Sequence, residues 1–302
     1  ARGFLDQILA AFDKADKLKI AFIGETIIDE YRYVSPLGKP AKECIIATVE
    51  TREKEAFEGG VIAASKQAEW PHVNIITSCQ AMRKTRYIDP AYTRKLFEVY
   101  SDREIELNAG QRARLQCEID ECLRECDVAV VLDFGHGLLC REERSLLMDS
   151  DVFLAVNAQT NTGNYGYNPI TKYNTAEYVC IDEPEARLAT GLQVDPLYQV
   201  LGALKADRSY DDVIITNGRL GSFVSTPTMP RQVPAFLING IDTMGAGDAF
   251  LAATAPLIAS GLPAEAAALV GNVAGGLKVG IVGHRQHVTR QDLIATIETL
   301  LK

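Results

Sequence analysis

Positive charge is in short supply in this sequence, and long apolar runs are absent. Its 31 Lys and Arg residues face 40 Asp and Glu residues, which gives a net charge of −9. This balance argues against binding to nucleic acid or to an anionic membrane surface. No apolar run reaches the roughly eighteen residues of a membrane-spanning helix, and the first residues lack a signal-peptide pattern. We therefore expect a cytoplasmic protein with no nucleic-acid partner and no membrane partner.

The sequence also lacks the cysteine spacing that is typical of a zinc or redox site. Its seven cysteines are scattered and odd in number. Cys117, Cys122 and Cys126 share one helical segment, but no Cys-x-x-Cys pair and no nearby His completes a set of metal ligands. Buried thiols in a reducing compartment are the favoured interpretation.

What the sequence does contain is an alternation of helical and strand patterns. From residue 108 onward, helices expected at 108–125, 141–149 and 196–207 are each followed by a short apolar run. This order predicts an α/β fold with a mostly parallel central sheet and helices on both faces. Residues 31–57 and 84–100 alternate instead and predict a small β lid. We expect one domain over residues 1–302.

The most informative string is DTMGAGDAF at residues 242–250, which opens an apolar helix. A helix start leaves backbone N–H groups without partners and attracts anions, and glycine lets a phosphoryl group come close. Gly245, Ala246 and Gly247 therefore form a candidate anion hole. Asp248 follows at once and could take a proton from a hydroxyl that attacks the phosphoryl group. The alternative is a Gly-rich turn before a capped helix.

This string resembles the DTxGAGD signature of the ribokinase-like (phosphofructokinase B) carbohydrate kinases. The resemblance implies that Asp248 is the catalytic base and that the amides of Gly245, Ala246 and Gly247 hold the transferred group. It also implies a ribokinase-like fold, ATP as phosphoryl donor, Mg²⁺, and a monovalent cation near Asp242.

The acceptor side resembles the heptose-phosphate kinase branch of that family. The stretch from GETIIDEY to the Gly59-Gly60 pair implies that Asp29 binds sugar hydroxyls and that the two glycines let the sugar approach the backbone. A solvated loop Asp and a helix N-cap are the structural alternatives. KTRYI resembles the family's KTR segment, so Lys84 and Arg86 are candidates to neutralise a phosphate already present on the substrate.

Two parts of the acceptor side depart from the family pattern. Ala63 and Ala64 stand where an Asn is expected after the glycine pair, and an Asn-rich loop at 157–169 replaces an Asp-Pro-Lys sequence. His136, in DFGHGLL, stands where that branch often has Lys, and we assign it no catalytic role. These departures leave the identity of the sugar open.

The resemblance implies a nucleotide site built from several strand ends. Glu185 would act on Mg²⁺ through water. An acid-rich helix start is the alternative for this segment. The Gly283-His284 turn should close the same cleft. The residues expected at the nucleotide are Asp182, Glu185, Thr216, Gly218, Gly221 and Asn272.

We therefore predict an ATP-dependent kinase that phosphorylates a hydroxyl of a sugar or sugar phosphate and resembles the heptose-phosphate 1-kinases. A kinase for another sugar or a nucleoside, and a non-catalytic module that binds sugar or nucleotide, stay open as alternatives. We also expect a homodimer formed through the β lid. A fusion with a nucleotidyltransferase is a further expectation.

Overall fold

The computed structural model describes residues 2–38, 45–92, 94–206, 208–236 and 240–302. Within these residues, eight strands form a main sheet in the order β13-β12-β11-β10-β9-β8-β1-β5. Strands β5 to β11 of this order run parallel, and β12 and β13 add an antiparallel edge. The strands are β1 (Ile20–Gly24), β5 (Val73–Ile76), β8 (Val128–Asp133), β9 (Phe153–Ala158), β10 (Thr175–Asp182), β11 (Ser209–Thr216), β12 (Ser222–Val224) and β13 (Arg231–Val233).

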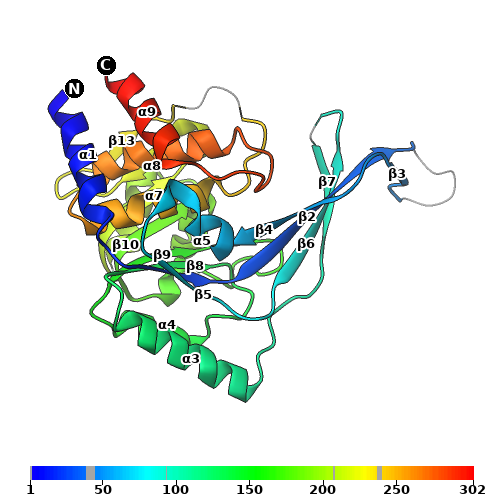
Figure 1. Ribbon diagram of the computed structural model, residues 1–302, viewed down its shortest axis with the longest axis horizontal. Helices are drawn as coiled ribbons and strands as arrows, with labels where there is room; N and C mark the ends of the chain where they lie inside the picture. The colour runs from blue at the N-terminus through cyan, green and yellow to red at the C-terminus, as the bar shows by residue number, and fades with distance from the viewer. Residues whose placement is uncertain (1, 39–44, 93, 207, 237–239) are drawn as a thin grey trace.

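Helices cover both faces of this sheet, as the alternation of patterns predicts. Figure 1 shows α1, α7, α8 and α9 on one side and α3 and α4 on the other. Strands β1 and β8 lie between them and are buried at every residue, which accounts for their continuous apolar sequences. The helices are α1 (Arg2–Ala15), α2 (Val61–Ser65), α3 (Ala109–Leu123), α4 (Arg141–Met148), α5 (Glu183–Thr190), α6 (Leu197–Ala206), α7 (Ala246–Ala259), α8 (Ala264–Lys278) and α9 (Arg290–Leu301), with short 3-10 turns at Gln67–Glu69, Ile170–Lys172 and Gly218–Leu220.

Helix α7 is the central helix of the fold. It packs against β8, β9 and β10 and against α1, α2 and α8. Its residues from Ala249 to Ile258 are all buried, so its N-terminus is fixed at the carboxyl edge of the sheet. Among the described residues, no helix is long and apolar enough to cross a bilayer.

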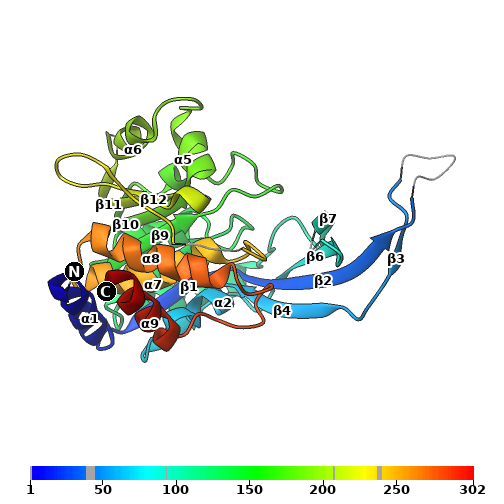
Figure 2. The same ribbon diagram turned by 90° about the horizontal axis from the view of Figure 1, so that it is seen from above.

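The predicted β lid is a second sheet, in which the described residues form strands in the order β3-β2-β6-β7 with β4 paired to β2. Figures 1 and 2 show it extending away from the layered body. It starts earlier than predicted, because β2 begins directly after β1 and its ladder to β4 includes the Gly59-Gly60 pair. Residues 39–44 and 93 of the predicted lid lie outside the described residues. The strands are β2 (Thr26–Pro36), β3 (Thr48–Glu50), β4 (Glu55–Gly60), β6 (Met82–Asp89) and β7 (Arg94–Tyr100).

Candidate active site

The start of α7 has the backbone shape expected of an anion hole. Gly245 precedes the helix in the left-handed conformation, with φ of 71°. A Cβ at this position would also lie 2.9 Å from Cε1 of His284, so both conformation and space require glycine. The amides that follow are the first of the helix and lack intrahelical acceptors. The amide of Ala246 makes only a long bond, 3.4 Å, to the carbonyl of Thr243, so a bound anion can compete for it.

A cavity of about 240 Å³ opens beside this helix start. It is lined by four of the residues expected at the nucleotide, Thr216, Gly218, Gly221 and Asn272, and by Ala246 and Gly247 of the anion hole. Asp182, Glu185, Gly245 and Asp248 are not part of its lining. The remaining lining residues come from four separate segments and are Arg219, Ala235, Gly240, Ile241, Thr243, Phe250, Gly275, Gly276 and Val279.

Two of the predicted nucleotide residues shape the wall of this cavity. The side-chain amide of Asn272 donates to the carbonyls of Val233 (3.0 Å) and Pro234 (3.1 Å). A Cβ on Gly221 would lie 2.0 Å from the carbonyl oxygen of Val233. Asn272 therefore holds the chain after β13 in place, and Gly221 allows it to pass close by.

Asp248 lies in the first turn of α7, half-buried. In the part of the chain that the structure describes, its carboxylate makes no hydrogen bond and no ion pair. Burial, together with the nearby charge of Asp29, raises its pKa to about 6, although His284, Lys278 and Lys84 partly offset the shift. A free carboxylate with a pKa near 6 is suited to accept a proton at neutral pH.

Asp29, whose charge acts on Asp248, is itself fixed by two partners. It lies on β2, buried, and pairs with Arg86 and with Nε2 of His284 at 3.2 Å. Burial alone would raise the pKa of Asp29, but His284 and Arg86 outweigh it and the pKa is lowered. A Cβ on Gly59 would lie 2.3 Å from Oδ2 of Asp29, so Gly59 leaves room for this carboxylate.

The two basic residues of the predicted phosphate site differ in their surroundings. Arg86 is engaged by Asp29 and by Glu98, whose carboxylate lies 3.3 Å from its Nε. Lys84 is buried and, within the described ranges, has no ion pair, and its Nζ lies 5.1 Å from the ring centre of Tyr100. Burial and the neighbouring Arg86 lower the pKa of Lys84. Lys84 is therefore the basic group with capacity left for an anionic substrate.

Glu185, predicted to act on Mg²⁺, and its neighbour Asp182 form a helix cap. Asp182 accepts from the amide of Glu185 (2.8 Å), and Glu185 accepts from the amides of Asp182 (2.9 Å) and Thr160 (3.0 Å). The structural alternative, a capped helix start, is thus part of the geometry. Burial and Asp182 raise the pKa of Glu185 to about 8, and the charge of Asp248 adds to this shift. Without a cation, a group with this pKa is mostly protonated near pH 7, and a Mg²⁺ ion that contacted it through water would favour the ionised carboxylate.

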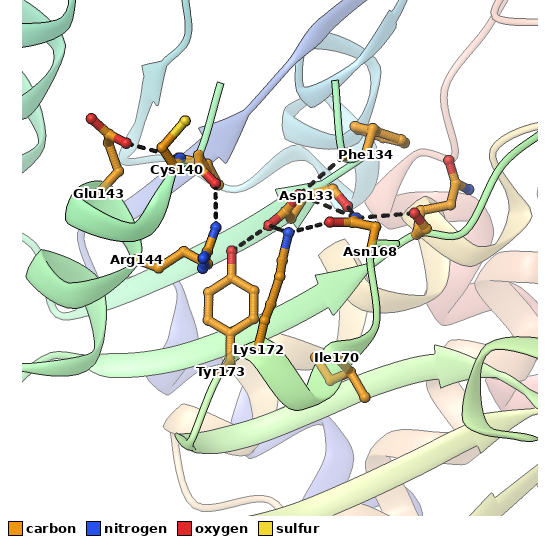
Figure 3. Close-up of polar contacts among 12 residues, drawn as sticks. Asp133, Phe134, Cys140, Glu143, Arg144, Asn168, Ile170, Lys172 and Tyr173 are labelled. Carbon is orange, nitrogen blue, oxygen red and sulfur yellow. Dashed lines mark hydrogen bonds and ion pairs between the residues drawn. The ribbon is translucent and has the colours of Figure 1, made fainter. Parts of the chain in front are cut away.

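The loop that departs from the family pattern packs against the turn after β8 (Figure 3). Asp133 is buried and pairs with the hydroxyl of Tyr173 and with Nζ of Lys172, both at 2.6 Å. Asn168 donates to the Asp133 carbonyl (2.9 Å) and Asn164 to the Phe134 carbonyl (2.9 Å). These amides hold the turn, so we assign them a structural role.

The same turn places a neutral histidine next to the acceptor side. His136 is buried, and burial together with Lys84 lowers its pKa to about 4. Its backbone amide donates to Glu25, which is fully buried. Burial and Asp133 raise the pKa of Glu25 to about 7.

Sequence reasoning missed Glu25, Lys278 and the contact between His284 and Asp29. Lys278 carried a usable signal, since Glu265 and Asn272 are the only other polar side chains in this helix. The pairing of His284 with Asp29 spans 255 positions of the chain, from 29 to 284, and no local pattern reports it.

Comparisons with known proteins find similar sequences and similar folds. Residues 170–289 match the family described as pfkB family carbohydrate kinase. The chain is 30% identical over 189 residues to the bifunctional protein HldE of Paramagnetospirillum magneticum, covering 61% of this chain and 38% of that protein. It is 25% identical over 205 residues to HldE of Nitratiruptor sp., covering 67% of this chain and 42% of the relative. The chain thus spans about two fifths of these relatives.

Two solved structures show the same fold. Ribokinase of Arabidopsis thaliana, complexed with ribose and ATP, aligns with a TM-score of 0.67 at 14% identity, over 93% of this chain and 99% of that one. Phosphofructokinase-2 of Escherichia coli, in complex with potassium, aligns with a TM-score of 0.69 at 14% identity, over 94% of this chain and 100% of that one.

Proposed function

We propose that this chain, whose residues 170–289 belong to the pfkB family of carbohydrate kinases, transfers the γ-phosphoryl group of ATP to a hydroxyl of a sugar phosphate. The observation that carries the proposal is Asp248, an unpaired carboxylate with a pKa near 6. It directly follows Gly247 of the cavity lining, and it is close enough to the buried Asp29 to feel its charge. The proposal treats residues 1–302 as one kinase domain with a β lid.

The geometry supports an in-line transfer. ATP occupies the 240 Å³ cavity with its phosphates toward the amides of Ala246 and Gly247. Asp29 binds the acceptor, and Asp248 takes the hydroxyl proton while the acceptor oxygen bonds to the γ-phosphorus. The bond from that phosphorus to the bridging oxygen breaks, and ADP leaves with the electron pair. Mg²⁺, held through water by Glu185, supplies charge neutralisation to the nucleotide phosphates when bound.

A phosphate already on the acceptor explains the surroundings of Lys84. A buried ammonium without an ion pair is costly, and an anionic substrate group would compensate it. The similarity to HldE proteins favours a heptose phosphate within this class. A kinase for another sugar or a nucleoside, and a module that binds without turnover, are the competing outcomes.

The lid also offers a surface on which a second copy of the chain could bind. Val49, Phe97 and Val99 on the lid strands are exposed apolar side chains, and a second copy of the lid could cover them. The relatives described as bifunctional are longer than this chain, which supports a fused nucleotidyltransferase in the whole protein. Dependence on ATP is consistent with a cytoplasmic protein.

ADP release with a panel of acceptors tests the proposal. We expect turnover with heptose phosphates and weaker or no turnover with unphosphorylated hexoses, pentoses and nucleosides. Turnover that is fastest with a nucleoside would replace the acceptor assignment. ATP binding by calorimetry without turnover on any acceptor would refute the kinase and favour the binding module.

A further inference from the structure

We propose that the ammonium group of Lys278 is a built-in cation that positions the start of α7, so that this kinase needs no monovalent cation. The inference rests on the proposed function for its catalytic consequence. It replaces the cation expected near Asp242. Phosphofructokinase-2, which shares the fold, has been solved in complex with potassium.

Lys278 lies at the end of α8 with a side chain that is fully buried. Its Nζ donates to the carbonyl of Gly283. Its Cε lies 3.4 Å from the position that a Cβ on Gly245 would occupy, so the side chain passes directly under the anion hole. A buried ammonium costs several kcal/mol unless negative charge compensates it. Burial lowers the pKa of Lys278, and the charges of Asp242, Asp248 and Asp29 offset part of that effect.

Asp242 has no free position for a metal ion. Its Oδ1 accepts from Nζ of Lys95 (3.0 Å) and from the amide of Met244 (3.2 Å). Its Oδ2 accepts from the hydroxyl of Tyr31 (2.7 Å) and from the amide of Gly283 (3.0 Å). Two donors on each oxygen use the lone pairs that a cation would need.

The turn that Lys278 holds contacts both the acceptor carboxylate Asp29 and the start of α7. Gly283, which binds Lys278, precedes His284, and His284 contacts Asp29 and lies against Gly245. The Lys278 ammonium therefore fixes one turn that touches the acceptor carboxylate and the anion hole. Lys278 is a positioning residue, since it acts through His284 and Gly245.

The first test asks whether the wild-type protein responds to potassium. Thermal unfolding is measured in potassium chloride and in tetramethylammonium chloride at equal ionic strength, and ADP release is measured in the same two salts. We expect the same Tm and the same turnover in both. A Tm or a rate that rises specifically with potassium would overturn the proposal. The thermal measurement needs no turnover, so it stands even where the proposed kinase activity fails.

The second test removes the ammonium. Lys278→Met should lower kcat at least tenfold with KM for ATP within about twofold. It should also move the acidic limb of the pH profile to higher pH, because a charge that favours ionised Asp248 is lost. Lys278→Arg should restore most of the activity. Lys205→Met, on α6, is the matched control and should leave all of these values unchanged.

A purely structural role would lower kcat without moving the pH profile, and that result would overturn the proposal. If Lys278→Met does not fold, the Lys278→Arg variant and the salt comparison on the wild-type protein still test the proposal. An arginine variant that folds but requires potassium would contradict the inference.

Discussion

Replacing Gly247 by alanine should impair the anion hole without destabilising the fold. A Cβ added at Gly247 meets no protein atom within 4 Å, yet Gly247 lines the cavity in which we propose that ATP binds. The free energy of unfolding should therefore stay unchanged or rise by up to about 1 kcal/mol, since alanine is the better helix residue. For a chain of this size, that gain raises Tm by about 2 °C or less.

The added methyl group holds a phosphoryl oxygen away from the helix amides. Loss of one such donor typically costs about 2.7–4 kcal/mol, or about a hundredfold to a thousandfold in rate. Because alanine keeps its N–H and only the approach is hindered, we expect kcat/KM to fall by about ten- to a thousandfold.

The assay is steady-state ADP release, with Tm measured on the same preparation. Gly202→Ala is the matched control, because that glycine also meets nothing within 4 Å and lies on α6. The control should gain a similar stability and keep full activity. A Gly247→Ala enzyme with unchanged kcat/KM would refute the placement of the phosphoryl group.

Three further predictions concern the acceptor side and the cluster under it. Gly59→Ala should raise KM for the acceptor at least tenfold, because the new Cβ would lie 2.3 Å from Oδ2 of Asp29. ATP binding, measured by calorimetric titration, should change little. Lys84→Met should raise KM for a phosphorylated acceptor at least tenfold but leave that of an unphosphorylated sugar unchanged, and equal effects on both would exclude a phosphate contact. Burial would raise the pKa of Asp242, but its hydrogen bonds and Lys95 outweigh burial and lower the pKa to about 2. The ionised carboxylate therefore stabilises the folded protein above the unfolded pKa near 3.8, and this stabilisation is lost as the pH falls toward 2. Denaturant unfolding of Asp242→Asn should show a loss of about 2 kcal/mol at pH 7 that shrinks below pH 4, and a constant difference would contradict this cause.

Local patterns were sufficient for the elements and for the convergence of four of the residues proposed to bind the nucleotide. The glycines and apolar run of residues 242–250 predict a helix start, and α7 begins at Ala246. Thr216, Gly218, Gly221 and Asn272 converge on one cavity because they follow strand ends or line the helix beside them. Parallel strands bring their carboxyl ends to one edge, so such positions can be predicted from order alone.

Long-range pairing could not be predicted in the same way. Asp29, Arg86 and His284 meet because the register of β2 with β6 and the turn after α8 place them together. Nothing in the residues around Arg86 indicates that Asp29 engages it, so the sequence overstates the positive charge available to a substrate phosphate. The partner of Lys278 could not be predicted for a similar reason, since Gly283 offers only a backbone carbonyl.

The pH dependence of kcat/KM, measured for the wild-type enzyme and for Asp248→Asn, tests the central claim most directly. The carboxylate must be ionised to accept the hydroxyl proton, so wild-type kcat/KM should rise tenfold per pH unit below a limb near pH 6 and level off above it. Asp248→Asn should lose at least a thousandfold in kcat and show no limb near pH 6, while ATP still binds. A variant that keeps the wild-type limb, or most of its rate, would show that Asp248 is not the base.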